Sequence, residues 1–153
     1  MPTLPITHFP QRHEADCLAA CSYMVLTYVG VRVRYNRLLR LLQIDTNEAG
    51  ASFYQLTQLQ NLGVVVNIGD GHMTLLDSLL NNQHPVIVSV DTRELPYWNG
   101  LWQFHAVVVV GSESEHILVN DPAFEHAPQI VNCIKFESAW LEREYVYATI
   151  TKR

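Results

Sequence analysis

The sequence lacks a hydrophobic run that could cross a membrane, because no apolar stretch approaches the roughly 20 residues that a spanning helix needs. Residues 1–5 also lack the charged segment and long apolar segment of a secretory signal. Charge is sparse, at 16% of residues with a net charge of −5, which argues against nucleic acid as the main partner. With 48% hydrophobic residues the chain is too apolar to be disordered. We therefore expect a cytoplasmic protein with no direct membrane insertion and no nucleic acid partner.

Cysteine is scarce as well. The three cysteines form no CxxC pair, so a disulfide framework is not expected. The histidines outside the candidate site described below are scattered without the spacing of metal ligands, so we predict no metal and no cofactor. Repeats, linkers and low-complexity segments are also missing. At 153 residues the chain is long enough to bury its own core, and we predict a single domain over residues 1–153.

The order of the expected elements indicates the fold class. Helices are predicted over residues 16–29, 35–42, 52–62, 74–81 and 136–141. Strands are predicted over residues 64–68, 86–90, 104–111, 116–120 and 145–151, with a polar loop over residues 45–51. Helices first and strands later indicate an α+β domain, in which a helical half packs on an antiparallel sheet. A site would then lie in the cleft between the two halves.

Residues 10–24 form the stretch around which the chain is organised. A loop is predicted to enter the first helix there, with Asp16 as its side-chain N-cap and Cys17 in its first turn. The partial positive charge at a helix start favours thiolate over thiol, and the thiolate is the nucleophile. Gln11 lies six positions before the thiol, where a side-chain amide can donate to an oxyanion that forms beside the sulfur.

A cysteine nucleophile needs a base and a group that orients the base, and both are found far along the chain. His105 interrupts an apolar strand, and Asp121 follows the next one. If the intervening turn centres on residues 113–114, residues whose numbers add to about 227 lie opposite each other. His105 then lies opposite position 122, next to Asp121. Asn120 is a competing orienter, but adjacent strand residues point to opposite sides, and we choose Asp121.

Each of these residues also has an ordinary interpretation. Cys17 fits a buried helix thiol, and His105 fits a hydrogen-bonded core histidine. Asp121 before a proline fits a turn initiator, and Gln11 fits a surface side chain. The four residues together favour the catalytic interpretation over these alternatives.

Taken together, four features resemble the bacteriocin-processing, or double-glycine, cysteine peptidases of the papain-like superfamily. They are the Gln11 and Cys17 spacing, the Asp16-Cys17 pair, the strand that begins at His105, and Asn120-Asp121-Pro122. The resemblance covers residues 9 to about 150 and implies a papain-like fold. It also implies a catalytic site with Cys17 as nucleophile, His105 as base, Asp121 as orienter and Gln11 as oxyanion donor. Family members are often the N-terminal domain of a peptide-exporting transporter and cut a leader after a Gly-Gly or Gly-Ala pair before export.

The sequence departs from that family in two ways. A glycine usually follows the nucleophile, whereas this chain has Leu18, whose side chain would narrow the cleft or alter the approach of the substrate backbone. The chain also ends at Arg153 without a membrane or ATPase domain, as expected for a free-standing peptidase or an excised domain. The alternatives to a peptidase are a non-catalytic peptide-docking domain of the same fold and a cysteine-dependent acyltransferase.

Two further groups of side chains are candidates for binding. Trp98 and Trp102 are predicted to wall the cleft and contact substrate, although aromatic packing is the default explanation for such residues. Four arginines gather around the second helix: Arg32, Arg34, Arg37 and Arg40. They fit a solvated helix face or, as the alternative, a docking patch for an acidic peptide.

Overall fold

The computed structural model describes residues 3–44 and 51–153, so all but the last residue of the predicted 45–51 loop lies outside the described part. The α-helices are α1 (Cys17–Tyr28), α2 (Tyr35–Leu41), α3 (Met73–Asn81) and α4 (Cys133–Leu141). The strands are β1 (Val64–Asp70), β2 (Val86–Asp91), β3 (Phe104–Glu113), β4 (His116–Asn120), β5 (Gln129–Asn132) and β6 (Val146–Lys152). Three 3₁₀ segments complete the set: η1 (Phe53–Leu62), η2 (Thr92–Glu94) and η3 (Pro96–Trp98).

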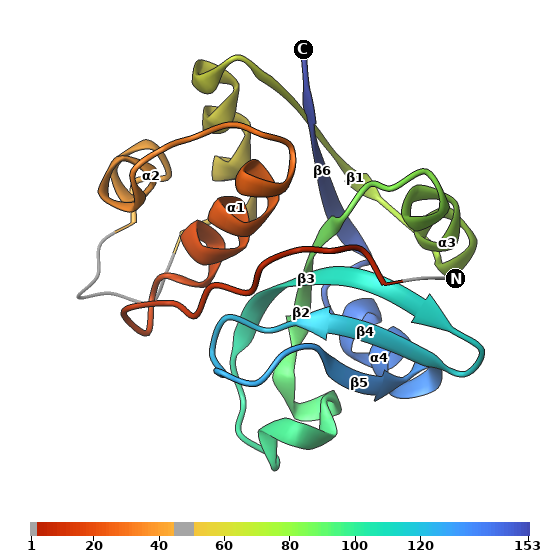
Figure 1. Cartoon of the computed structure of the whole chain (residues 1–153). Coiled ribbons are helices and arrows are strands. Elements are labelled where there is room, and N and C mark those ends of the chain that lie inside the picture. The colour runs from red at the N-terminus through yellow and green to blue at the C-terminus, as the bar shows by residue number, and fades with distance from the viewer. Residues whose placement is uncertain (1–2, 45–50) are drawn as a thin grey trace.

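The strands form one antiparallel sheet in the order β1-β6-β2-β3-β4-β5. Its two faces are covered by different helices, as Figure 1 shows. On β3, Ala106 and Val108 belong to the core under α1, α2 and η1, whereas Val107 and Val109 belong to the core under α3 and α4. This alternation is the ordinary period of a strand. The predicted α+β fold, with N-terminal helices on an antiparallel sheet, is confirmed.

The hairpin between β3 and β4 differs from its prediction in register. Glu113 pairs with His116, so the turn lies at residues 114–115 rather than 113–114. A bulge between Val109 and Gly111 then shifts the pairing back by one residue, so that Val108 lies opposite Asn120. The open end of the hairpin therefore still places Asp121 near His105.

Segment η1 is a 3₁₀ helix where an α-helix was expected. Its apolar side chains recur every three residues, at Phe53, Leu56, Leu59 and Leu62. A spacing of three aligns these side chains on one edge of a 3₁₀ helix, and Leu56 and Leu59 are fully buried there. At the start of η1 the Ser52 hydroxyl accepts from the Tyr54 backbone N–H, and the Gln55 side-chain amide donates to Gln43.

Strand β5 was missed by the sequence analysis. It has four residues at the edge of the sheet, and Val131 is its one buried side chain, so no alternation marks it. Within residues 3–44 and 51–153, no helix combines the length and the hydrophobicity that crossing a membrane requires.

Candidate active site

Cys17 is the first residue of α1, at the end of a loop that is fixed to the opposite half of the molecule. The Gln11 backbone N–H donates to the Pro122 carbonyl at 2.8 Å, directly beside Asp121. Further along, Cys21 is fully buried in the core one turn after Cys17. The helix start is therefore held close to the end of β4.

Asp16 occupies the N-cap position, but its side chain does not cap the helix, contrary to the prediction. The carboxylate is fully buried and accepts from His13 Nδ1 at 2.9 Å and from the Tyr35 hydroxyl at 3.1 Å. These partners tie the loop before Cys17 to α2. They explain the departure, because the carboxylate turns away from the helix start to reach them.

His105 and Asp121 form a buried pair, with His105 Nε2 at 2.6 Å from Asp121 Oδ1. Three further donors hold the carboxylate: the Ala123 backbone N–H on Oδ1, and the Tyr97 hydroxyl and Trp98 Nε1–H on Oδ2. The Trp98 ring also meets the imidazole edge-on, with 5.0 Å between ring centroids. With four donors on one carboxylate, the orientation of the imidazole is fixed.

Asn120 points to the other side of the strand, as the alternation argument predicted. Its amide contacts the Ile6 carbonyl and Met24 Sδ on the α1 side of the sheet. Asp121 is therefore the residue that bonds the imidazole, and Asn120 contributes to the core under α1.

The electrostatics of the site place a proton on the imidazole. Burial alone would lower the pKa of His105, but the Asp121 carboxylate and hydrogen bonds to Asp121 and Cys17 raise this pKa to about 10. Burial alone would raise the pKa of Cys17, yet its hydrogen bond to His105 and the charge of His105 bring the pKa below its ordinary value of 9.0. Since the thiol is then the stronger acid, the favoured state is a thiolate beside an imidazolium.

Two neighbours of this pair were missed by the sequence analysis. The backbone N–H of Ala106 bonds the Cys17 sulfur and favours the thiolate. The Gln103 amide nitrogen lies 3.3 Å from His105 Nδ1, the ring nitrogen that is left for Cys17. Ala106 carries no sequence signal, since any residue supplies a backbone N–H, and only its position after His105 could have indicated it.

Gln11 lies in the same loop but faces another hollow. Its amide donates to the His13 carbonyl at 2.8 Å and to the Glu14 carbonyl at 3.1 Å, and Trp98 lines the same hollow. An oxyanion role for Gln11 requires that one of these N–H groups leave its carbonyl when substrate binds.

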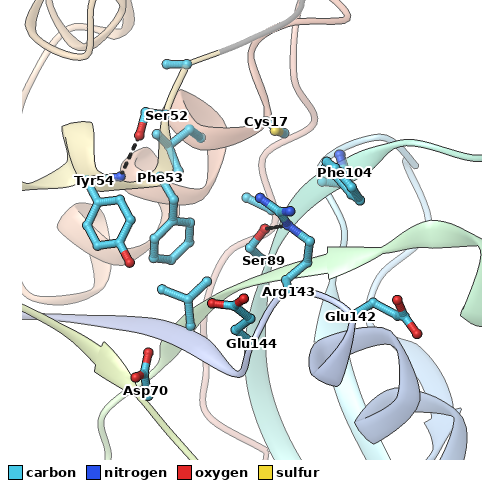
Figure 2. A pocket seen from close by; sticks show the side chains of 15 residues that line it. Cys17, Ser52, Phe53, Tyr54, Asp70, Ser89, Phe104, Glu142, Arg143 and Glu144 are labelled. Carbon is cyan, nitrogen blue, oxygen red and sulfur yellow. Dashed lines mark hydrogen bonds between the residues drawn. The ribbon is translucent and has the colours of Figure 1, made fainter.

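A pocket of about 460 Å³ opens beside Cys17 and His105, and Figure 2 shows its lining. Leu18, the residue in the place of the family glycine, lines it and is itself buried. Trp102 is exposed and is not among the lining residues, but its ring packs edge-on against Phe104, which lines the pocket. Trp98 is buried and holds Asp121, so its main contacts are with the His105–Asp121 pair.

The remaining predictions concern metal ligands and the four arginines around α2. Among the described residues, no group of three or more His, Cys, Asp or Glu side chains could hold a metal ion. The four arginines around α2 are exposed and line one open hollow with Tyr23 and Thr27.

Comparisons with known proteins agree with the geometry of the site. The model of the peptidase C39 family matches residues 6–149. Comparison with curated protein sequences gave no match.

Several solved structures share the fold at low sequence identity. The peptidase domain of Streptococcus ComA, a bifunctional ABC transporter of a quorum-sensing pathway, is 20% identical with a TM-score of 0.79, over 97% of this chain and 99% of that one. A C39-like peptidase from Bacillus anthracis is 17% identical with a TM-score of 0.77, over 97% and 96%. A double-glycine motif protease from an AMS/PCAT transporter, solved with its leader peptide, is 16% identical with a TM-score of 0.77, over 99% and 94%.

Proposed function

This chain belongs to the peptidase C39 family, and on that premise we propose that it hydrolyses peptide bonds through a covalent intermediate on Cys17. The observation that carries the proposal is the position of His105. Its ring bonds Asp121 through one nitrogen and faces the thiol with the other. A nucleophile, a base and an orienting group in this order are the minimum that a cysteine peptidase needs.

The reaction would proceed in two halves. The Cys17 thiolate attacks the peptide carbonyl carbon, and the imidazolium of His105 gives its proton to the leaving amine as the C–N bond breaks. A thioester remains on the sulfur. His105, now neutral, takes a proton from water, whose oxygen attacks the thioester carbon and releases the acid and the thiolate. Asp121 keeps the imidazole oriented and stabilises its charged form throughout.

The oxyanion of each half needs donors near the sulfur. The backbone N–H of Cys17 lies at the start of α1, where helix N–H groups have no partner within the helix. We assign the second donor to Gln11, which supplies a side-chain N–H after it releases the carbonyl of His13 or Glu14.

The substrate would be a leader or precursor peptide that the protein cuts in the cytoplasm after a small-residue pair such as Gly-Gly, with a peptide-exporting transporter as the partner. Two of the similar structures support this class, since one is a domain of an ABC transporter and one is a double-glycine motif protease solved with a leader peptide. The buried Leu18 in the pocket wall favours small substrate residues next to the sulfur.

Isotope-labelled water tests the proposal. A peptide with an internal Gly-Gly pair is incubated with the protein in water enriched in oxygen-18, with and without an added primary amine, and the products are analysed by mass spectrometry. We expect cleavage, with the heavy oxygen in the new carboxylate. A product that carries the amine in preference to oxygen would identify an acyltransferase. Binding of the peptide without any cleavage would identify a docking domain, and either result would contradict the proposal.

A further inference from the structure

Arg143 enters the pocket beside Cys17 from the turn between α4 and β6. Figure 2 shows its guanidinium pointing from that turn toward Ser89 and Phe104, on the side of the pocket where Cys17 lies. Phe104, which the guanidinium contacts, directly precedes His105 in β3, so the cation lies close to the proposed catalytic pair. The family resemblance assigns no role to this arginine.

Two contacts hold the guanidinium in place. Its Cζ atom lies 3.9 Å from the centroid of the Phe104 ring, a short cation–π contact. Its Nε–H donates to Ser89 Oγ at 3.3 Å, and Ser89 is buried on β2. The bond to Ser89 uses Nε, and the contact with Phe104 uses the flat face of the guanidinium. The four N–H groups on the two terminal nitrogens remain directed away from Ser89 and are suited to a planar, two-oxygen acceptor.

The backbone that presents Arg143 is unusual. Glu144 and Tyr145 follow it with φ of 57° and 58°, in the left-handed region that non-glycine residues seldom adopt. Hydrogen bonds keep them there: the Tyr145 N–H donates to the Trp140 carbonyl, and the Tyr145 carbonyl accepts from Gly71. Sparsely populated backbone conformations of this kind cluster at binding and catalytic sites.

The charge of Arg143 is not neutralised by a close partner. None of the ion pairs between described residues includes Arg143. Asp70, Glu142 and Glu144 also line the pocket, but all three are exposed, and in Figure 2 Glu142 points away from the guanidinium. An exposed carboxylate gains little from a substrate cation, whereas a part-buried, stacked guanidinium binds a carboxylate strongly. The local contact therefore favours an acidic ligand.

We propose that Arg143 forms a carboxylate-binding subsite of the peptide cleft, which selects an aspartate or glutamate side chain close to the scissile bond. This specificity rests on the proposed peptidase function. Cys17 and Arg143 line the same pocket of about 460 Å³, so we place the acidic residue within three positions of the scissile bond.

A matched peptide series tests the subsite. Each peptide contains Gly-Gly, is amidated at its C-terminus, and carries one Glu or one Gln either directly before the pair or at one of the three positions after it. Amidation ensures that any preference comes from the side-chain carboxylate. We expect kcat/KM for the Glu peptide to exceed that for the Gln peptide by about tenfold at one position, because a charge-assisted two-point contact replaces a neutral one.

Three variants locate the effect. Arg143→Gln should bring the Glu/Gln ratio to about one, and Arg143→Lys should keep part of it, because a lysine retains the charge but loses the planar fork. Arg153→Gln, at the exposed C-terminus, removes the same charge and should leave the ratio unchanged. A ratio of one in the unmodified protein at every position, or a preference that survives Arg143→Gln, would overturn the subsite.

A binding measurement separates this proposal from the peptidase proposal. Fluorescence anisotropy with the same labelled peptides is carried out on the Cys17→Ala protein with and without Arg143→Gln. Tighter binding of the Glu peptide that disappears with Arg143→Gln supports the subsite even if no cleavage is found. Equal binding of both peptides in the Cys17→Ala protein overturns it even if cleavage occurs.

Discussion

Replacing Cys17 with alanine should lower cleavage of a Gly-Gly peptide by at least about 10⁴-fold, because removal of the nucleophile leaves only binding and oxyanion stabilisation. The helix itself should be unaffected, since Cys17 is its first residue and alanine is the best helix former. The measurement is kcat/KM by chromatography of the cleaved peptide, with a thermal melt of each variant.

Cys133→Ala is the matched control for that substitution. Cys133 is also the first residue of a helix, α4, but burial and the carboxylates of Asp77, Glu115 and Glu137 raise the pKa of its thiol. We expect this variant to cleave at the rate of the unmodified protein. Cleavage by the Cys17→Ala protein at that same rate would rule out the covalent mechanism.

Asp121→Asn should reduce both catalysis and stability. Asparagine keeps the shape, but its NH₂ group must face one of the two pairs of donors that the carboxylate accepts. We expect kcat to fall by about 10³–10⁴-fold, because the imidazole loses its orientation and its stabilising charge. The free energy of unfolding should fall by about 3–5 kcal/mol, the usual result of removing one partner of a buried charge pair.

Denaturant titration and activity per folded molecule separate these two effects. Asp77→Asn, at an exposed position on α3, removes one carboxylate without touching the pair and should change neither quantity. An Asp121→Asn protein that is folded and cleaves at an unchanged rate would show that His105 needs no orienting carboxylate.

The pairing of His105 with Asp121 was predictable from the sequence because hairpin geometry is local. The predicted turn was misplaced, so Glu113 pairs two residues further along the chain than expected. The bulge near Val109 reduces this error in register to one residue. The remaining offset of one residue is within the reach of two side chains. The alternation that put Asn120 and Asp121 on opposite sides of the strand, so that only one of them could face His105, needed only the period of a strand.

Other parts of the site depend on packing that no local pattern encodes. Tyr97 and Trp98 are adjacent in the sequence, but their hydrogen bonds to Asp121 depend on how η3 is oriented against the sheet. Asp16 has the sequence of an N-cap, yet tertiary partners on another helix outweigh that local preference. The two residues that follow Arg143 adopt left-handed backbone conformations although neither is a glycine, so nothing in the sequence indicated this turn.

The most direct test of the Cys17–His105 pair is the rate of iodoacetamide alkylation at each cysteine, followed by peptide mapping from about pH 5 to pH 10. Because His105 lowers the pKa of Cys17, the thiolate should be present below pH 9.0, and Cys17 should react faster than Cys133 at neutral pH. In His105→Gln the reaction of Cys17 should move to higher pH. Equal rates for the two cysteines with the same alkaline profile, unchanged by His105→Gln, would contradict the activated pair on which the account is built.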